Sequence, residues 1–439
     1  SNGNVYTNNL IHSGFLNISG GNLDIDGNYT ASGNVNANIS GGTIKVEGNW
    51  TSTGNGFDPT GGTVEFSGNL GQTISLASGN NFYDLKINNT HSSNKVSAQG
   101  SSLVVSNHLN IADGIFESAS DYHDVTIATG ATLELTGDIT VSGNWTNDGT
   151  FTPGTHTVTF DGSTAQSITG GMSTIFHNLT INNSSAEITL NSSANYTAAL
   201  GTLNFSQGLI NVNSQSLDFG VGATVTNASN SSHAYNGPLD RSFDNNNQSF
   251  TYPVGDGTNY KPISLNMSSS NTNVVSAAYL FANQNQSALN SSLSSIETYG
   301  WDIQRSTGFD GFTITIPFDA SYNISDIFNL TIVMWDGTEW IEIPSTYSGT
   351  SSNGSITTNS PISDFSNRYF ALGYKSSSPG HYWVAGSGDW NDLSHWVTSS
   401  GGSINATNIP TANDNVYFDA NSFSSSGQTV SISNGAADC

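Results

Sequence analysis

The chain has 439 residues, of which 33 are acidic and only 8 are basic, and its formal net charge is −25. Nucleic-acid binding and attraction to anionic lipid are excluded, because both need clusters of Lys and Arg, and the basic residues of this sequence are scattered singly. No apolar run approaches the length of a membrane-spanning helix, whereas 35% hydrophobic residues, with 10% aromatics, are enough for packed cores. The abundance of Asn, Ser, Thr and Gly is typical of an extracellular all-β protein.

Residues 1–231 are predicted to form a parallel β-solenoid, because a short phrase recurs there at nearly constant spacing. The phrase reads Gly-Gly-x-apolar-x-apolar-x-Gly-Asn, and its second glycine is Gly21, then Gly42, then Gly62. The period is therefore 21 and then 20 residues, which suits three short strands and three corners, the content of one solenoid coil. Strand alternation places the apolar positions on one face, so stacked coils should bury a continuous apolar column.

The sequence also contains a longer repeat, which includes several copies of the short one. Five phrases recur 94 or 95 residues later in the chain, and we predict two copies of a block of four to five coils, ending near Thr226. We expect Asn88-Asn89 and Asn182-Asn183 to face outward and to stack their amides along the corners. The matching phrases are Gly48-Asn49-Trp50-Thr51 with Gly143-Asn144-Trp145-Thr146, Thr63-Val64-Glu65-Phe66 with Thr157-Val158-Thr159-Phe160, Gln72-Thr73-Ile74 with Gln166-Ser167-Ile168, Leu85-Lys86-Ile87-Asn88-Asn89 with Leu179-Thr180-Ile181-Asn182-Asn183, and Leu109-Asn110-Ile111 with Leu203-Asn204-Phe205.

Residues 232–375 are predicted to form an antiparallel β-sandwich, because the strand patterns become longer and hairpin signals appear. Asp256-Gly257 and Asp336-Gly337 are dipeptides that favour hairpin turns. The one weak helical pattern of the chain runs from Ala288 to Ile296, and we treat it as a helix candidate.

Residues 376–439 are predicted to be a linker and the start of a further β-rich module that would cap or open another solenoid. The linker is Ser376-Ser377-Ser378-Pro379-Gly380, and the new unit begins at Tyr382. The sequence ends on Cys439, its single cysteine, which cannot form a disulfide within the chain. We expect a free thiol there, or a partner further along a longer parent protein.

Three sets of phrases carry a family resemblance. They are Gly143-Asn144-Trp145-Thr146 with Gly154-Thr155-His156-Thr157-Val158-Thr159-Phe160-Asp161-Gly162, Phe250-Thr251-Tyr252-Pro253-Val254-Gly255-Asp256-Gly257 with Tyr260-Lys261-Pro262, and Trp383-Val384-Ala385-Gly386-Ser387-Gly388-Asp389-Trp390 with Trp396 and Pro410-Thr411-Ala412-Asn413-Asp414-Asn415-Val416-Tyr417-Phe418-Asp419. These phrases resemble the modular, very large secreted surface and adhesin-like proteins of the Bacteroidota, which are usually exported by the type IX system. They span nearly the whole chain and are specific for architecture rather than for function. The resemblance implies one period of a longer extracellular or cell-surface shaft, whose partners are other modules of the same chain.

β-Solenoids often host polysaccharide lyases and hydrolases, which need two carboxyl groups held at a fixed separation. Asp24 and Asp26 alternate with inward apolar residues, so they should point to solvent, and their counterparts in the next coil are Lys45 and Glu47. The acidic column is interrupted, and we expect no catalytic residue and no enzyme. The tightest His and Asp cluster, at residues 121–124, would need ligands from other coils to hold a metal ion.

Calcium is the cation that the sequence suits best, because loop carboxylates and backbone carbonyls are ligands for a hard cation. The alternative, which we prefer, is that the Asp-Gly and Asn-Asp dipeptides are simply turns. No other cofactor is expected. The candidate calcium ligands are Asp256, Asp336, Asp389, Asp392, Asp414 and Asp419.

Trp383, Trp390 and Trp396 could form a platform on which sugar rings stack, since aromatic faces pack on pyranose rings. Their spacing of seven and then six residues, in a region that ends with Tyr417-Phe418, more often indicates a small hydrophobic core. Both interpretations stay open at this point.

Our first hypothesis is a non-enzymatic structural and adhesive module of a giant extracellular fibre or surface appendage. The solenoid would be a stiff spacer, and the sandwich a joint, a subunit contact or a ligand-binding node. Identical chains could also assemble as a homo-oligomer, because sandwich edge strands and flat solenoid faces favour symmetric contacts. The alternatives are a carbohydrate-binding module, with glycans or cell surfaces as partners, and a β-helix enzyme that degrades polysaccharide.

Overall fold

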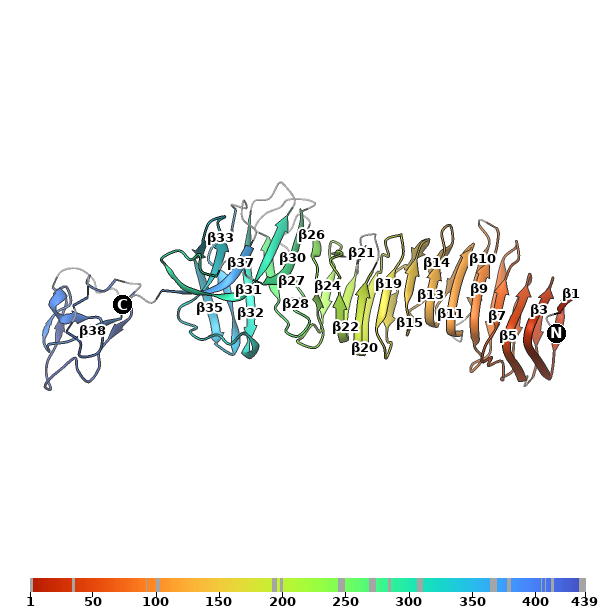
Figure 1. Cartoon of the computed structure of the whole chain (residues 1–439), viewed down its shortest axis with the longest axis horizontal. Coiled ribbons are helices and arrows are strands. Elements are labelled where there is room, and N and C mark those ends of the chain that lie inside the picture. The colour runs from red at the N-terminus through yellow and green to blue at the C-terminus, as the bar shows by residue number, and fades with distance from the viewer. Residues whose placement is uncertain are drawn as a thin grey trace.

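The computed structural model of the chain describes residues 3–33, 36–91, 93–99, 103–191, 196–197, 200–243, 249–267, 274–282, 286–305, 311–363, 369–376, 380–403, 405–406, 408–411 and 414–433. Figure 1 shows an elongated molecule, in which short strands follow one another along the long axis from the N-terminus to an antiparallel sandwich. Strands make up 57% of the chain and helices 2%, so the all-β prediction is confirmed. Cys439 lies outside the described residues.

A parallel β-solenoid of about 11 turns, with coils of about 21 residues, forms the N-terminal part of the molecule, as the short repeat predicts. In the described residues, all pairing in its 16-stranded sheet is parallel, and this sheet continues around a corner of the coils from one face to the next. Its strands are β1 (Asn4–Thr7), β3 (Phe15–Ile25), β5 (Asn36–Val46), β7 (Thr63–Phe66), β9 (Phe82–Asn88), β11 (Val104–Asp113), β13 (Asp121–Ile127), β15 (Ile139–Val141), β16 (Trp145–Asn147), β18 (Thr157–Phe160), β19 (Gln166–Thr169), β20 (Asn178–Leu190), β22 (Thr202–Asn211), β24 (Thr224–Thr226), β25 (Ala234–Tyr235) and β28 (Val254–Gly255).

A second parallel sheet, with 8 strands among the described residues, is made by shorter strands of the coils. Its strands are β2 (Leu10–His12), β4 (Tyr29–Ala31), β6 (Trp50–Ser52), β8 (Gln72–Leu76), β10 (Lys95–Gln99), β12 (Ile115–Ser118), β14 (Thr132–Leu135) and β17 (Thr150–Thr152).

Columns of apolar side chains fill the solenoid. Ile44 lies opposite Leu23 on one neighbouring strand and opposite Val64 on the other, as the repeat predicts. On the second sheet, the rings of Tyr29 and Trp50 stack with their centroids 3.7 Å apart. Because each fully buried large apolar side chain stabilises a fold by roughly 1.5–3 kcal/mol, these columns are the main source of stability.

The 94-residue superrepeat is present in the structure as a repeated set of buried hydrogen bonds. Gln72 donates from Nε2 to the carbonyl oxygens of Val46 (3.0 Å) and Gly48 (2.8 Å). Gln166, 94 residues later, donates from Nε2 to those of Val141 (2.9 Å) and Gly143 (2.7 Å). Both glutamines are buried inside the solenoid, so the duplicated blocks share a polar arrangement as well as an apolar pattern.

The outward amide ladder predicted at two Asn-Asn dipeptides is wrong for their second residues. Asn89 and Asn183 are fully buried. Asn89 donates from Nδ2 to Gln72 Oε1 at 3.1 Å, and Asn183 donates in the same way to Gln166 at 3.0 Å. Strict alternation fails here because the strand turns a corner at this point, and the amide is directed inward to the buried glutamine.

The solenoid passes into the sandwich through a shared sheet. In an 8-stranded sheet, β26 (Leu239–Phe243) pairs in parallel with the solenoid strand β23 (Leu217–Phe219) and antiparallel with the sandwich strand β30 (Val274–Ala282). Parallel pairing also continues through β25 and β28. We call this region, where solenoid and sandwich strands share one sheet, the seam. The other strands of this sheet are β21 (Tyr196–Thr197), β31 (Leu293–Arg305), β37 (Tyr369–Lys375), β33 (Leu330–Trp335) and β34 (Trp340–Ile343).

A 5-stranded antiparallel sheet completes the sandwich, as predicted from the hairpin signals. Asp336-Gly337 forms the predicted turn between β33 and β34, where Trp335 lies opposite Trp340. The strands of the second sheet are β27 (Ser249–Tyr252), β29 (Ile263–Met267), β32 (Phe312–Asp319), β36 (Asn353–Thr358) and β35 (Ser345–Thr350), and the 3₁₀ helix η1 (Ala320–Tyr322) follows β32.

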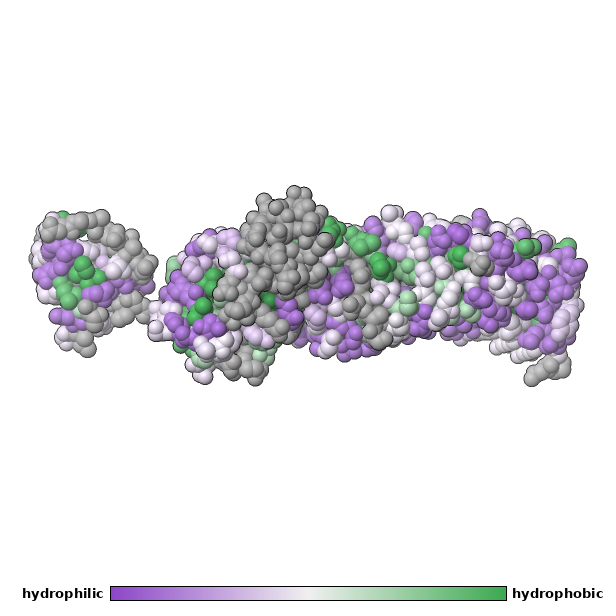
Figure 2. Space-filling model, turned by 90° about the horizontal axis from the view of Figure 1, so that it is seen from above, coloured by the Kyte–Doolittle hydropathy of each residue, from purple (hydrophilic) through white to green (hydrophobic). Residues whose placement is uncertain are grey.

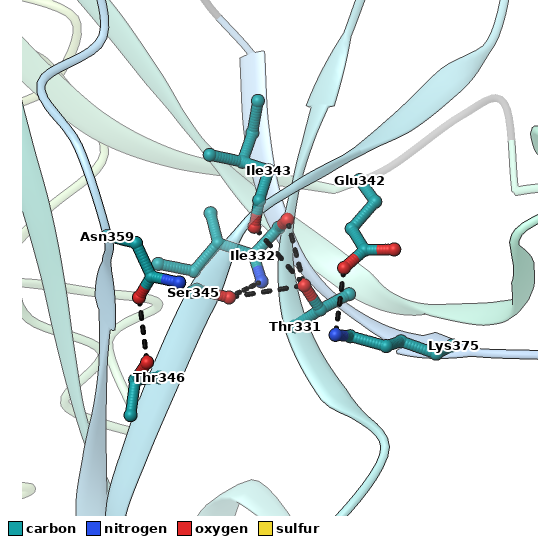
Figure 3. Close-up of polar contacts among 8 residues, drawn as sticks. All are labelled: Thr331, Ile332, Glu342, Ile343, Ser345, Thr346, Asn359 and Lys375. Carbon is teal, nitrogen blue, oxygen red and sulfur yellow. Dashed lines mark hydrogen bonds and ion pairs between the residues drawn. The ribbon is translucent and has the colours of Figure 1, made fainter. Parts of the chain in front are cut away.

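A buried threonine holds the corner at which the chain crosses from one sandwich sheet to the other (Figure 3). Thr331 Oγ1 donates to the carbonyl oxygen of Ile343 at 3.3 Å and lies 3.1 Å from Ser345 Oγ. Ser345 Oγ in turn accepts a hydrogen bond from the backbone N–H of Ile332 at 3.0 Å. Because β34 ends at Ile343 and β35 begins at Ser345, these bonds fix the crossing itself.

The helix candidate from Ala288 to Ile296 is wrong. Leu293 and Ile296 belong to β31, and the register of β31 against β37 shifts twice along this stretch. Those irregularities put two buried apolar residues three positions apart, a spacing that imitates a helix in the sequence.

The C-terminal part is a small β-rich unit, in agreement with the prediction of a further β module. Its described strands form a 3-stranded sheet and a 2-stranded sheet. They are β38 (His381–Trp383), β40 (Trp396–Val397), β41 (Val416–Tyr417), β39 (Gly388–Asp389) and β42 (Val430–Ser431), and the 3₁₀ helix η2 (Leu393–His395) precedes β40.

Candidate functional site

The strongest candidate site is a groove of about 510 Å³ in which the last solenoid strands meet the sandwich. We call it the junction groove. One wall comes from the solenoid side, from β25 and the turn after β28, and the other comes from β30 and β31. The lining residues on which the argument depends are Tyr235, Asn236, Asp256, Phe281, Thr298 and Tyr299.

The carboxylate of Asp256 is fixed by its own turn. Its Oδ1 accepts hydrogen bonds from the backbone N–H groups of Thr258 (2.8 Å) and Asn259 (2.6 Å). Burial raises the pKa of Asp256, but these hydrogen bonds and the nearby His233 lower it overall, so the group is ionised at neutral pH. His233 also holds the turn, because its Nε2 lies 3.2 Å from the backbone N of Gly257, which donates to it.

Aromatic rings on both walls of the groove are held in place by contacts with neighbouring residues. The ring of Tyr235 lies so close to Gly257 that a Cβ at this glycine would be 3.1 Å from the ring. Tyr235 also donates its hydroxyl hydrogen to Glu187 Oε2. On the sandwich wall, the half-buried ring of Phe281 packs against Tyr369, with centroids 5.1 Å apart. The rings are therefore carried on strands and fixed by contacts, as a preformed site requires.

A buried lysine lies next to the groove. The Nζ of Lys261 is 3.6 Å from the ring centroid of Tyr322 and 5.0 Å from that of Tyr299. The Nζ also donates to the carbonyl oxygen of Ser321 at 3.2 Å. Burial lowers the pKa of Lys261, and nearby carboxylates partly oppose that effect. Since only 3% of Lys261 is exposed, this cation stabilises the aromatic wall by cation–π contact and does not meet a ligand itself.

A second, larger groove of about 950 Å³ lies over the corners of β20 and β22. We call it the serine groove. Both strands have register shifts there, which open the surface. Phe205 lines it but is only 1% exposed, so the groove offers no aromatic face. Its polar lining residues include Ser184, Ser185, Glu187, Gln207, Asn227 and Ser229.

Two carboxyl groups share a hydrogen-bonding partner on the seam. Asp218 lies opposite Asp240 on β23 and β26, and Ser216 Oγ donates to Asp218 Oδ1 and lies 2.5 Å from Asp240 Oδ2. Burial and the charge of Asp240 raise the pKa of Asp218 to about 6, although the hydrogen bond from Ser216 lowers it. Such a pair can hold one proton between two carboxyls. Neither residue lines the junction groove or the serine groove.

The candidate calcium ligands are not brought together. Asp336 Oδ1, for example, accepts hydrogen bonds from the backbone N–H groups of Thr338 and Glu339. Its role in this turn is enough to explain the aspartate at this position. Among the described residues, no group of three or more His, Cys, Asp or Glu is placed to hold a metal ion. The remaining candidates each accept a hydrogen bond from a nearby backbone N–H, namely Asp256 from Thr258, Asp389 from Asn391, Asp392 from Ser394, Asp414 from Thr411 and Asp419 from Asn421.

The three tryptophans proposed for sugar stacking form a core instead. Trp383 and Trp396 are fully buried and Trp390 is 6% exposed. The ring of Trp396 lies 5.0 Å from that of Trp383 and 4.9 Å from that of Trp390, in both cases edge to face. Because the rings cover one another, none presents a face to a sugar, and the small-core interpretation describes their placement.

The acidic column of the first coils is interrupted by lysines, as expected. Asp24 lies opposite Lys45, Lys45 opposite Glu65, and Glu65 opposite Lys86 on successive strands. Lys86 Nζ is 3.3 Å from Glu65 Oε2, so the column is a ladder of alternating charge. In the cluster at residues 121–124, the polar side chains contact separate residues of the next coil, namely Thr140, Ser142 and Asn144.

The junction groove and the Asp218–Asp240 pair were not predicted from the sequence. A signal for the pair exists, since Leu217-Asp218-Phe219 and Leu239-Asp240-Arg241 repeat an apolar-Asp pattern at the spacing of one coil. The groove has no such signal, because its walls come from separate strands of two architectures.

Comparison with protein-family models, with curated proteins and with solved structures finds no match to this chain. No described helix has the length and the apolar character that crossing a membrane would require.

Proposed function

We propose that this chain is a stiff, non-enzymatic spacer module of an extracellular fibre or surface appendage, of the kind that very large secreted proteins of the Bacteroidota form. The observation that carries the proposal is the seam, where β26 belongs to solenoid and sandwich at once. One hydrophobic core continues across it, from Ile25 near the start of the solenoid to Tyr374 in the last sandwich strand. Continuous backbone pairing and packing leave little freedom for bending at this point.

Asparagine side chains on the outside of the coils also favour a rod with protected backbone. Asn9 Oδ1 accepts a hydrogen bond from the backbone N–H of Asn28 at 2.7 Å, and Asn28 Oδ1 accepts one from that of Asn49 at 2.7 Å. Asn49 Oδ1 continues the series to the backbone N–H of Thr73 at 2.8 Å. These bonds satisfy backbone donors at the corners between strands. With a net charge of −25, they favour a soluble rod suited to an extracellular environment.

Solution scattering and electron microscopy of the purified chain test this proposal. We expect the solenoid to appear as a straight rod about 50 Å long, from about 11 turns at about 4.8 Å per coil, with the sandwich in line with it. A compact particle, or particles bent at variable angles at the seam, would contradict the proposal.

A variant at the seam provides the matched comparison. Ala278 lies on β30 opposite Leu239 of β26 and is fully buried. Proline there removes a backbone donor and disrupts the pairing, so Ala278→Pro should broaden the distribution of angles between solenoid and sandwich. The substitution Ser351→Pro, in the exposed turn between β35 and β36, should leave the distribution unchanged.

A second candidate function is saccharide binding, favoured by the junction groove with its aromatic and carboxylate walls. It is compatible with attachment as the purpose of the shaft. Hydrolysis of polysaccharide is not proposed, because Asp218 and Asp240, which interact strongly with one another, lie outside both grooves.

A further inference from the structure

We propose that the junction groove is a binding site for a neutral saccharide, with one pyranose ring held between its aromatic walls. The inference rests on the second candidate function and names the class of saccharide, and it is independent of the spacer function, since a rod needs no ligand. It assigns the binding activity to the seam rather than to the tryptophan-rich C-terminal unit.

The chemistry of the walls matches the two sides of a pyranose ring. Such a ring has apolar C–H faces and hydroxyl groups around its edge, so it is bound by aromatic rings together with a few fixed polar groups. The junction groove offers the half-buried rings of Tyr235, Phe281 and Tyr299. It also offers the exposed carboxylate of Asp256 and the exposed hydroxyl of Thr298.

Charge selects the class of saccharide. The carboxylate of Asp256 is ionised at neutral pH, and Glu187 contacts the hydroxyl of Tyr235 at the edge of the groove. Lys261, a cation next to the groove, is buried and held by Ser321 and two tyrosine rings. Uronic acids and sulfated sugars would therefore meet a negative wall on a chain of charge −25, whereas uncharged hydroxyls can donate hydrogen bonds to Asp256.

The size and rigidity of the groove are suitable. Its volume of about 510 Å³ lies within the range of roughly 300–1,000 Å³ that small-molecule sites occupy. Asp256 is held by the N–H groups of Thr258 and Asn259, and the next residue, Gly257, is held by His233. The polar group is therefore in place before a ligand arrives, which lowers the entropic cost of binding.

The serine groove is a weaker candidate, although it is larger. It has many hydroxyl and amide groups but no exposed aromatic ring, because Phe205 is buried. Without a stacking surface, a sugar there would exchange hydrogen bonds with water for hydrogen bonds with protein at little net gain. The hydrogen bond between Tyr235 and Glu187 links the two grooves.

The test is a glycan array carrying mannan, β-glucan, xylan and chitin oligosaccharides as neutral probes, with alginate and heparin as anionic probes. The full chain is used, and the best neutral probe is then titrated by calorimetry. We expect binding to at least one neutral probe and none to the anionic ones. Preferential binding of an anionic probe, or no binding to any neutral probe, would overturn the proposal.

Two variants locate the site. Phe281→Ala removes a stacking ring and should weaken binding at least 10-fold. Thr298→Trp fills the groove from an exposed position on β31 without removing any core contact, so it should abolish binding even if Phe281→Ala destabilises the sandwich. The matched controls are Phe328→Ala, at an aromatic residue that is 79% exposed, and Thr350→Trp, at an exposed strand position outside the groove.

Unchanged affinity in both groove variants would place any binding elsewhere and contradict the proposal. Scattering from the same samples separates this result from the spacer function, because Thr298→Trp should leave the rod unaltered. A chain that binds saccharide but is not a rod would overturn only the spacer proposal.

Discussion

Gln166 makes, one superrepeat further along the chain, the same hydrogen bonds that Gln72 makes. Each donates from Nε2 to two carbonyl oxygens of earlier coils, and each accepts from a backbone N–H four residues before it, that of Gly68 in the first block and that of Gly162 in the second. Each also accepts from a buried asparagine 17 residues later. A buried amide in an apolar column is costly unless every polar atom has a partner, and here the whole set is present twice.

Replacement of either glutamine by leucine should destabilise the solenoid by about 2–4 kcal/mol, because two carbonyl oxygens, an N–H and an asparagine amide lose their partner at once. Gln72→Leu and Gln166→Leu should cost similar amounts, and the double variant should show their sum, since the sites are in separate blocks. Urea denaturation monitored by circular dichroism measures this. Gln99→Leu, at an exposed position, is the control and should change stability by less than about 0.5 kcal/mol. Unequal costs for the two glutamines would argue against equivalent blocks.

The Asp218–Asp240 pair should make stability depend on pH in the direction opposite to ordinary acid denaturation. The pKa of Asp218 is raised from 3.8 to about 6 by burial and by Asp240. The contribution of this group to stability is therefore complete below about pH 4 and is lost as the pH rises through 6. Asp218→Asn should stabilise the chain at pH 7.5 by roughly 1 kcal/mol, a value reduced for partial exposure, and should have little effect at pH 4. Melting temperatures measured across this range test it.

Asp26→Asn is the control for that experiment, because Asp26 is exposed and lies outside the seam. Its melting curve should follow that of the unmodified chain at each pH. If Asp218→Asn lowers the melting temperature at pH 7.5, the two carboxyls do not repel one another in the folded chain.

The buried hydroxyl of Thr331 should matter more than the exposed hydroxyl of Thr346 (Figure 3). Thr331→Val preserves the shape of the side chain but leaves the carbonyl oxygen of Ile343 and the hydroxyl of Ser345 without this partner, at a cost of about 1–2 kcal/mol. Thr346→Val removes a 2.7 Å hydrogen bond to Asn359 in an exposed position, and water can replace it. Thermal unfolding of both variants gives the comparison, and equal melting temperatures would contradict it.

Arginine and lysine should not be interchangeable at position 241. The Arg241 guanidinium is almost fully buried, donates to the carbonyl oxygen of Gly220, and lies 4.8 Å from the ring centroid of Phe250. A planar guanidinium can stack and donate at the same time, whereas an ammonium is more strongly hydrated and cannot. Arg241→Lys should therefore destabilise the seam by at least about 1 kcal/mol. Hydrogen exchange should show faster exchange in β26 and β27 of this variant, while the first coils exchange as before.

The matching control is Lys375→Arg. Lys375 forms a partly exposed ion pair with Glu342 at 2.9 Å, and either cation can make such a pair. Exchange rates near Lys375 should stay within error of the original chain, and a seam that is indifferent to Arg241→Lys would show that stacking is not needed there.

The solenoid was predictable because the residues that determine its coils recur in the sequence at a short, nearly constant spacing. The inward apolar positions around Ile44 and the spacing of Gly21 and Gly42 fix the strand register, and the structure pairs these residues as the sequence predicts. Position 42 requires glycine, because its φ is +78° and a Cβ would lie 2.5 Å from the carbonyl oxygen of Gly21 on the preceding coil. Local constraints of this kind recur in each coil and can therefore be recognised in the sequence.

Features that depend on corners and on contacts between architectures were not predictable. Asn89 turns inward at a corner, where alternation no longer decides which way a side chain points. The register shifts of β31 make Leu293 and Ile296 resemble a helix face. Tyr235 and Phe281 are 46 positions apart in sequence and lie in different sheets, on β25 and β30, so they line one groove only where the solenoid meets the sandwich.

The placement of Gln72 and Gln166 has a consequence for how a solenoid of this kind can change its length. Each glutamine reaches back to an earlier coil and forward to an asparagine on a later strand, so it spans several coils of its own block. Insertion or deletion of a single coil inside that span would separate the glutamine amide from its partners. The amide would then be left without hydrogen bonds in an apolar interior. Gain or loss of an entire block would leave these hydrogen bonds intact. We therefore expect longer or shorter solenoids of this kind to differ by whole 94-residue units, or by coils that lie between Asn89 and Val141, outside the two constrained spans.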